Sequence, residues 1–261
     1  MGKLRRLNRI FQPDGKTFIV AMDHGTISGI TPGLENPGSV LEMIKEGGAD
    51  AVICNVGVAK KYERELSGLG IILRLDLSPT IIGSGHNSHF GFHAEYALKL
   101  GADAVVINAG PGAGVEETTL ATIAQIVEVC EDLNLPVVGE MSPGGFDSDP
   151  SMRSFENIGL GARIASELGV DFIKTIYHEG FEEIVNGVFC PIVVLGGSKT
   201  DKPVEFISSI KNSISAGAAG VAIGRNVWGA DNPEAMTRAL HGVIHGGMSA
   251  EAAAEILQSA S

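Results

Sequence analysis

The sequence predicts an α/β fold, a (β/α)8 TIM barrel formed by residues 1–261 as a single domain. Three observations support this prediction. Strand and helix patterns alternate along the chain, which is typical of a parallel sheet. The strand candidates number eight, and no Gly-x-Gly-x-x-Gly turn indicates an open, doubly wound sheet. A length of 261 residues also suits one large barrel.

Four of the strand candidates belong to a degenerate repeat. In each copy a helical pattern ends at a glycine, which tolerates the left-handed conformation of a helix end. The apolar run that follows has the length and β-branched content of a buried strand. The four copies are GADAVICN from Gly48, GADAVVIN from Gly101, GVDFIKTI from Gly169 and GAAGVAIG from Gly217.

The remaining elements continue this alternation. Further strands are predicted at residues 18–23, 71–76, 136–141 and 191–196. Helices are predicted at residues 37–47, 92–100, 115–133, 154–168, 203–216 and 233–245, with a short terminal helix at 249–258. The connection between Asn55 and Gly70 is short for a full helix, and the pattern of residues 77–91 predicts a loop.

The amino-acid composition argues against some classes of binding partner. A formal net charge of −12 and a sequence pI near 5.0 argue against non-specific binding of nucleic acid or of an anionic membrane. An anionic substrate is still compatible, because a local cluster of donors can outweigh distant surface charge. The chain has no signal-peptide pattern and no apolar run of about 18 residues. We therefore expect a cytoplasmic protein, and we expect it to be a homo-oligomer.

Neither the cysteines nor the histidines have the spacing of a metal site. The three cysteines lie in apolar surroundings and are predicted to be reduced core residues: Cys54, Cys130 and Cys190. A second group is His86, His89 and His93, of which the last two are four residues apart. No carboxylate motif accompanies them, so a polar loop that leads into a helix is favoured over a zinc site. We therefore expect no metal.

The repeat provides an internal control that singles out one lysine. The residues five positions after each repeat glycine are Ile53, Val106, Lys174 and Ala222. A lysine is rarely buried without a partner, and burial favours the neutral amine, which is the nucleophile that attacks a carbonyl carbon. Lys174 is therefore predicted to form a Schiff base with a carbonyl substrate. The alternative is a structural lysine paired with a carboxylate inside the barrel.

Other polar residues fall where strands are predicted to end. Asn55 and Asn108 lie seven positions after their repeat glycines, on the same strand face and nearer the C-terminal end, where barrel enzymes have their active sites. They are predicted either to hydrogen-bond a substrate or to cap the following turns. Asp23 and His24 end the first strand and could move protons or bind hydroxyl groups. The alternative for this pair is a loop-capping aspartate and an exposed histidine.

Two glycine-containing turns predict a phosphate site. Loops after the seventh and eighth strands of such barrels often bind phosphate through backbone N–H groups, and an arginine adds a charged fork. The two turns are Gly196-Gly197-Ser198-Lys199 and Gly224-Arg225-Asn226.

Taken together, these residues resemble the bacterial and archaeal class I fructose-bisphosphate aldolases. That family also contains a synthase that makes an aminodideoxy-heptulosonate and a thiolase that acts on a phosphorylated quorum signal. The resemblance runs from about residue 17 to the C-terminus. Its most specific segments are AMDHG (21–25), FIKTIYHEGFEEIV (172–185), PIVVLGGSK (191–199) and GVAIGRNVW (220–228).

The resemblance implies roles for individual residues. Lys174 matches the Schiff-base lysine, Asp23 the acidic residue that assists proton transfer, and His24 its neighbour in the substrate pocket. The phosphate cradle is matched by Gly196, Gly197, Ser198, Gly224 and Arg225. The implied enzyme is a metal-independent lyase or transferase without a cofactor, which acts on a phosphorylated ketose or on dihydroxyacetone phosphate.

One departure from the family pattern affects the proton-transfer chemistry. The aldolases carry Tyr-Pro-Arg-Gly after the fifth strand, with the tyrosine as general acid and base, whereas this chain has Ser142-Pro143-Gly144-Gly145. Serine is a poor acid or base unaided, so Ser142 is expected only to contact the substrate. The candidates for the missing role are Glu140, Tyr177 and Asp23.

Glu140 shares a strand face with Ser142, one step deeper in the barrel. Desolvation there is expected to raise the pKa of its carboxyl group and to suit it to proton transfer. The alternative is that Glu140 only pairs with Lys174 or with another buried cation.

Two other functions are considered for the whole chain. One is a thiolase-like acyl transfer from a phosphorylated diketone. The other is a non-catalytic sugar-phosphate-binding protein, which the missing tyrosine favours. Retention of both Lys174 and Asp23 argues against the binding protein, since binding phosphate alone requires neither.

Overall fold

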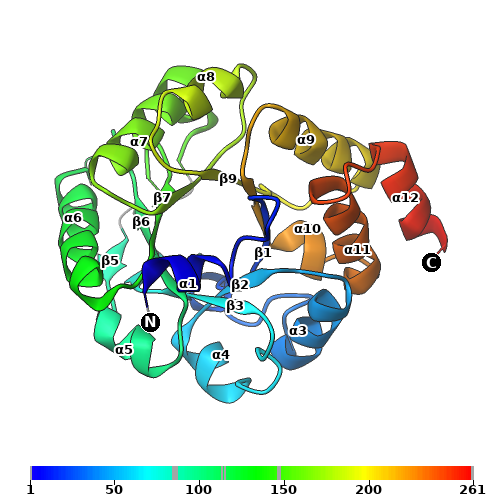
Figure 1. Cartoon of the computed structure of the whole chain (residues 1–261), viewed down its shortest axis with the longest axis horizontal. Helices are drawn as coiled ribbons and strands as arrows, with labels where there is room; N and C mark the ends of the chain where they lie inside the picture. The colour runs from blue at the N-terminus through cyan, green and yellow to red at the C-terminus, as the bar shows by residue number, and fades with distance from the viewer. Residues whose placement is uncertain (1, 84–87, 113, 115, 146–147, 260–261) are drawn as a thin grey trace.

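The computed structural model describes residues 2–83, 88–112, 114, 116–145 and 148–259. Within these residues, eight parallel strands close into a barrel in the order β1-β10-β9-β8-β7-β6-β3-β2 (Figure 1). The predicted barrel is therefore confirmed. Its strands are β1 (Thr17–Ala21), β2 (Ala51–Cys54), β3 (Gly70–Arg74), β6 (Ala104–Ala109), β7 (Val137–Met141), β8 (Phe172–Thr175), β9 (Ile192–Leu195) and β10 (Gly220–Ile223).

Helices surround the barrel (Figure 1). The crossover helices are α3 (Pro37–Glu46), α4 (Val56–Lys61), α5 (Ala94–Lys99), α6 (Glu116–Leu133), α7 (Phe155–Glu167), α8 (Phe181–Asn186), α9 (Pro203–Ser215) and α11 (Pro233–Ile244). The shorter or terminal helices are α1 (Lys3–Leu7), α2 (Gly25–Ser28), a 3-10 turn at Pro150–Arg153, α10 (Arg225–Trp228) and α12 (Ala250–Ser259). None of these described helices is long and apolar enough to cross a membrane.

Several short elements of the structure were not predicted from the sequence, among them two helices and a pair of strands. The helices α4 and α8 have six residues each, fewer than two full turns, so neither shows the repeated apolar spacing from which a helix is predicted. The predicted loop at residues 77–91 contains part of a small antiparallel pair, in which β4 (Asp76–Leu77) faces β5 (His89–Phe90). Two-residue strands are too short to give an alternating pattern.

The barrel interior is apolar over most of its height. Residues Ile53, Val106 and Ala222 belong to one buried interior cluster, so the repeat does place equivalent positions on the inner face. The N-terminal segment covers this cluster, because Ile10 is fully buried in it and the ring of Phe11 lies 5.1 Å from that of Phe172. Figure 1 shows α1 lying over the middle of the ring of strands.

The N-terminal end of the barrel is held by aspartates of the repeat. Each accepts a hydrogen bond from the backbone N–H of a neighbouring strand: Asp50 from Phe18 at 2.6 Å, Asp103 from Ile71 at 3.0 Å and Asp171 from Val137 at 2.8 Å. These bonds satisfy strand donors at the edge of the sheet, where the ladder itself ends.

The three cysteines are free, with Cys54 and Cys130 buried and Cys190 half-buried. Burial raises the pKa of the Cys54 thiol to about 12, which makes it an unreactive core side chain.

Candidate active site

Four ionisable side chains meet inside the C-terminal half of the barrel. Arg74 comes from β3, Glu140 from β7, Lys174 from β8, and Asp23 follows β1. Glu140 and Lys174 are register partners on adjacent strands, so both point into the barrel at one level. Lys174 is 5% exposed, and Arg74 and Asp23 are each 4% exposed. The apolar layers below and the strands around them exclude water from these charges.

Glu140 links the two cations. Its Oε1 forms an ion pair with Lys174 Nζ, and its Oε2 accepts a hydrogen bond from Arg74 Nη2. Both oxygens of this carboxylate are therefore bound by cationic donors. The predicted alternative, in which Glu140 pairs with Lys174 or another buried cation, describes the resting geometry correctly.

Arg74 contacts three carboxylates at once. Besides Glu140, its Nε donates to Asp23 Oδ2 and its Nη1 donates to Asp76 Oδ1 at 3.0 Å. Such a planar fork can hold several acceptors in fixed directions, which an ammonium group cannot do.

Sequence reasoning missed Arg74 and Asp76, although a signal was present. The run IILRLD was predicted as a buried strand, and a charge in its middle is the same kind of anomaly that identified Lys174. The comparison of positions covered only the four repeat strands, and β3 is not one of them.

Arg74 and Lys174 shift the pKa of the Glu140 carboxyl in the direction opposite to the prediction from the sequence. Burial alone would raise it, but Arg74 and Lys174 outweigh burial and lower the pKa of the Glu140 carboxyl to about 2. The expectation of a raised pKa is therefore wrong, because the sequence reasoning considered desolvation without the arginine. Asp23 behaves alike: burial opposes its ionisation, but Arg74, Lys174 and His24 hold the pKa of that carboxyl well below its usual range.

Asp76 is the exception among the carboxylates. Burial raises its pKa, the charge of Arg74 opposes that rise, and the charge of Glu140 adds to it. Its Oδ1 accepts from the backbone N–H of Asn108 at 3.2 Å, and its buried Oδ2 has no hydrogen-bond partner among the described residues. Asp76 is thus fixed to β6 through one oxygen and anchors Arg74 through the same oxygen.

His24 lies at the edge of this cluster. Its Nδ1 is 3.6 Å from Asp23 Oδ1, and its ring lies 5.2 Å from that of Trp228. Burial lowers the pKa of the imidazole despite the nearby Asp23, and the positive charges of Lys174 and Arg225 add to the lowering. The side chain is 23% exposed, so it is a half-buried ring at the rim of the cluster rather than the exposed loop histidine of the alternative prediction.

The predicted polar residues take different positions. Asn55 donates from Nδ2 to the backbone carbonyl of Asp23 at 2.7 Å, which fixes the end of β1 instead of capping the turn after β2. Asn108 is buried and donates to Ser142 Oγ at 2.8 Å. The Ser142 hydroxyl is therefore held by Asn108, and Ser142 is half-buried beside the cluster.

Tyr177 is not brought to the cluster. Its ring packs edge-on against Phe181 of α8, with the centroids 5.6 Å apart, and it joins the core between the strands and the helices. Tyr177 lies two residues beyond the end of β8, where strand alternation no longer fixes the direction of a side chain. As a candidate for the missing acid, Tyr177 is the least well placed of the three.

The two glycine turns lie next to each other. Asn226 of α10 donates from Nδ2 to the carbonyls of Gly196 and Ser198, both at 3.0 Å, and thereby ties the loop after β9 to the loop after β10. A Cβ atom on Gly224 would lie 2.6 Å from the carbonyl oxygen of Ala21 and 2.8 Å from the His24 ring, so only glycine fits there. The paired loops are therefore adjacent to His24, and the exposed Arg225 stands beside them.

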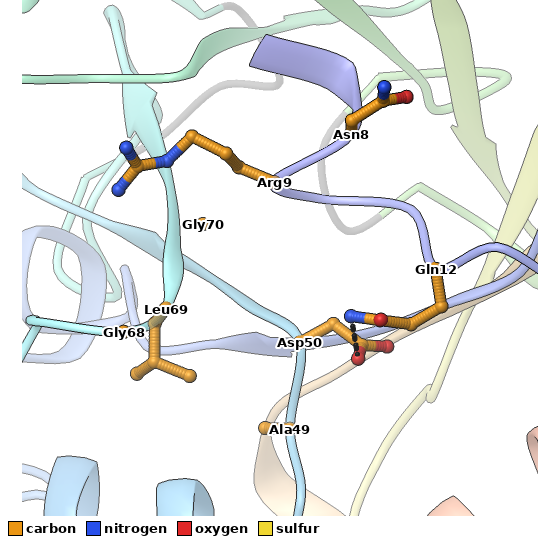
Figure 2. Close-up of a pocket in the computed structure, with 8 residues that line it drawn as sticks. All are labelled: Asn8, Arg9, Gln12, Ala49, Asp50, Gly68, Leu69 and Gly70. Atoms are coloured by element: carbon orange, nitrogen blue, oxygen red, sulfur yellow. Dashed lines mark hydrogen bonds between the residues drawn. The ribbon is translucent and has the colours of Figure 1, made fainter. Parts of the chain in front are cut away.

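The opposite end of the barrel contains a cavity of about 330 Å³ (Figure 2). Arg9, Gln12 and Asp50 line it, and Gln12 donates to Asp50 at 2.7 Å. It lies at the N-terminal ends of β2 and β3, away from Lys174. Barrel enzymes react at the other end, so we do not assign the chemistry to this cavity.

Among the described residues, no group of histidines, cysteines and carboxylates is arranged to hold a metal ion. Of the three histidines considered for zinc, His89 lies on β5, His93 precedes α5, and His86 lies outside the described residues.

A buried lysine between carboxylates, at the C-terminal end of a (β/α)8 barrel, defines the class of Schiff-base-forming aldolases. The family described as DeoC/LacD family aldolase matches residues 17–230. The chain belongs to this family and is an aldolase-type enzyme of the lyase class.

Relatives and solved structures agree with this assignment. The chain is 36% identical over 253 residues to 2-amino-3,7-dideoxy-D-threo-hept-6-ulosonate synthase 1 of Archaeoglobus fulgidus, which covers 96% of this chain and 94% of the relative. It is 30% identical to an uncharacterized aldolase of Saccharolobus solfataricus over 94% of this chain and 95% of the relative.

A crystal structure of an archaeal fructose 1,6-bisphosphate aldolase is similar at 31% identity and a TM-score of 0.85, over 94% of this chain and 100% of that chain. In another archaeal structure the catalytic lysine is covalently bound to the carbinolamine intermediate of the substrate. That structure has 31% identity and a TM-score of 0.84, over 93% of this chain and 99% of that chain. The recognised family and the aldolase-type, lysine-based chemistry predicted from the sequence are thereby confirmed.

Proposed function

We propose that Lys174 forms the imine with a phosphorylated ketose or with dihydroxyacetone phosphate, and that Glu140 moves the protons. The observation that carries this proposal is the contact between Lys174 Nζ and Glu140 Oε1 inside the barrel. A general acid or base must lie within hydrogen-bond reach of the proton that it transfers. Glu140 meets this requirement for the attacking nitrogen itself.

The proton balance of imine formation fits one carboxylate. Glu140 takes a proton from the Lys174 ammonium, and the neutral amine attacks the ketone carbon. One proton of the added nitrogen then moves to the alkoxide oxygen, which gives the neutral carbinolamine. The carbinolamine hydroxyl then receives that proton from Glu140 and leaves as water, which restores the Glu140 carboxylate beside a protonated imine. One ammonium and one ketone thus give one iminium and one water, and the carboxylate is unchanged.

The restored carboxylate is then available for the carbon–carbon step. It accepts the proton of the substrate hydroxyl as the carbon–carbon bond breaks, and the bonding electrons move into the protonated imine, which becomes an enamine. Protonation of the enamine carbon regenerates the imine, and hydrolysis releases the product from Lys174. In this scheme Asp23 stays ionised next to Arg74 and His24 and orients the substrate hydroxyls.

The phosphate group is proposed to lie between the paired loops. The loop that carries Gly197 and Ser198 is tied to the loop that carries Gly224 and Arg225, because Asn226 donates to the carbonyls of Gly196 and Ser198. The similar solved structures are fructose bisphosphate aldolases, and the Archaeoglobus relative is a synthase of a heptulosonate. The substrate class of this chain, a phosphorylated keto compound, rests on those likenesses together with the loop geometry.

Borohydride trapping tests the proposal. The protein is incubated with dihydroxyacetone phosphate, fructose 1-phosphate or fructose 1,6-bisphosphate, reduced with borohydride and digested for mass spectrometry. The expected result is the mass of one reduced keto-phosphate on the peptide that contains Lys174. Lys60, which is exposed on α4, serves as the control lysine and should stay unmodified.

Trapping on Lys60 or Lys199 in place of Lys174 would refute the assignment of the nucleophile. Trapping at Lys174 by fructose 6-phosphate and by unphosphorylated fructose with equal efficiency would refute the phosphate requirement while leaving the imine chemistry intact.

A further inference from the structure

We infer that Arg74 is the positioning residue that keeps Glu140 a fixed, ionised proton acceptor in front of Lys174. The inference rests on the proposed function, because it concerns the same proton transfer. It assigns a role to a residue that neither the predicted site nor the phosphate loops include.

The first support is the geometry of the guanidinium. Arg74 is 4% exposed and uses three separate nitrogens for three carboxylates, on Asp23, Asp76 and Glu140. Its contact with Glu140 uses Oε2, which leaves Oε1 free to face Lys174. The arginine therefore fixes which oxygen of Glu140 meets the nucleophile.

The second support is the way in which Arg74 itself is anchored. Asp76 Oδ1 accepts from Arg74 and also from the backbone N–H of Asn108, so the arginine is tied to the β6 backbone through one oxygen. A side chain held at three points loses little further entropy when the substrate binds. This anchoring also distinguishes Arg74 from a general counter-ion, which would need no fixed direction.

The third support is electrostatic. Three carboxylates buried together repel one another, and without a central cation burial would favour their neutral forms. The charged and titratable groups that act on Glu140 are Arg74 and Asp76 on the β3 side, Lys174 on β8, and Asp23 and His24 after β1. Arg74 and Lys174 are the cations that lower the pKa of Glu140, and Lys174 loses its positive charge when it gives its proton to Glu140. Arg74 keeps its charge throughout and so favours the return of Glu140 to the carboxylate.

The test compares Arg74→Met and Arg74→Lys with wild type in the pH dependence of kcat/KM, whose limbs report groups of the free enzyme. In wild type the acidic limb of Glu140 lies below the measured range of pH 4 to 8. In Arg74→Met we expect that limb to move upward by about two to three pH units, so that the rate falls visibly as the pH is lowered from 6 to 4. The value of kcat should fall about 10²-fold, whereas KM for the phosphorylated substrate should change little.

Arg74→Lys separates charge from geometry. A lysine keeps the positive charge but cannot hold three carboxylates in a planar fork, so we expect the acidic limb to stay near its wild-type position while kcat falls about 10-fold. The matched control is Arg9→Met, because Arg9 also pairs with a buried aspartate, Asp103 at 3.0 Å, at the other end of the barrel. This control should keep the wild-type pH profile.

An unchanged acidic limb and near-normal kcat in folded Arg74→Met would overturn the inference. If that variant does not fold, the double variant Arg74→Met/Asp76→Asn removes one of the unpaired charges and is tested in the same way. If the double variant also fails to fold, wild-type kcat in Arg74→Lys overturns the inference and a reduced kcat supports it. Failure of the proposed function is distinguishable, because wild type itself would then trap no imine at Lys174.

Discussion

The two ends of the barrel both hold carboxylates beside cations, but they bind them in different ways. At the N-terminal end, Asp50, Asp103 and Asp171 each accept a hydrogen bond from a strand N–H. At the C-terminal end, the carboxyl oxygens of Asp23 and Glu140 contact the side chains of Arg74, Lys174 and His24. A carboxylate bonded to the backbone cannot take up a proton without weakening the sheet. One bonded to side chains can, so the first group serves stability and the second suits chemistry.

The same comparison explains why aspartates recur in the repeat while the lysine occurs once. Each repeat strand begins at the sheet edge, where an extra N–H needs an acceptor, and three of the four copies provide an aspartate there. The inner position five residues after the glycine faces the packed core, and an apolar residue is the ordinary solution. Lys174 departs from it, and its ammonium group is paired there with the Glu140 carboxylate.

The largest expected difference between the two ends of the barrel is the loss of turnover when a lysine is replaced at each end. Lys174→Met should reduce turnover on the order of 10³-fold or more, since no other described side chain in the cluster is a primary amine. Lys3→Met, which removes an ion pair with Asp171 at 3.2 Å at the N-terminal end, should leave turnover unchanged and lower Tm slightly. Steady-state rates and thermal unfolding measure both. Equal losses of turnover would contradict the division between the two ends.

Neutralising the carboxylate beside Lys174 should have the next largest effect. Glu140→Gln keeps the shape of the side chain but cannot accept a proton, and we expect kcat to fall by about 10²-fold or more. Borohydride should still trap an imine at Lys174, but more slowly, because water must then move the protons of imine formation. Ser142→Ala should change kcat much less, because the serine hydroxyl is bound by Asn108 and is a weak acid. Near-normal turnover in Glu140→Gln would move the proton transfer to Asp23.

The phosphate loops predict an effect on binding. Arg225→Ala should raise KM for a phosphorylated substrate by about 10- to 100-fold, since losing a charged hydrogen bond costs about 1.5–3 kcal/mol. The KM for an unphosphorylated analogue in the same variant is the control and should not change. If the variant and wild type bind both substrates alike, the phosphate lies elsewhere.

The sequence predicted the barrel and the single lysine because both depend on local patterns. Glycine-to-strand repeats are visible in one dimension, and so is a charge within an apolar run such as that around Lys174. The pKa of Glu140 could not be predicted in this way, since it depends on Arg74, which is 66 positions away in the chain. The packing of Tyr177 against Phe181 could not be predicted either, because Tyr177 lies beyond the end of β8, where strand alternation no longer applies.

The smallest predicted effect concerns stability at the N-terminal end. His245 of the segment after α11 lies 2.9 Å from both Asp14 Oδ2 and Asp50 Oδ2, and so joins the N-terminal segment to the start of β2. Burial opposes the charge on His245, but the two aspartates outweigh it and raise the pKa of the imidazole. The pKa of the Asp14 carboxyl is lowered although burial opposes this, because His245 donates to it and the backbone N–H of Lys16 does too.

A histidine with a raised pKa in the folded state stabilises the fold fully below its unfolded pKa of about 6.5, and this stabilisation is lost as the pH rises through the folded value. The Asp14 carboxylate sets the limit of this stabilisation at acidic pH. Its contribution is present above about pH 4 and is lost as the pH falls through its lowered pKa.

His245→Gln should therefore lower Tm more at pH 5.5 than at pH 8.5. The difference should be at most about 2–4 °C, which for a chain of this length corresponds to about 1 kcal/mol. His89→Gln, on an exposed strand residue, is the control and should have no pH-dependent effect. A larger loss of Tm in His245→Gln at pH 8.5 than at pH 5.5 would show that His245 acts as a neutral hydrogen-bonding group, and the electrostatic account of this end of the barrel would be wrong.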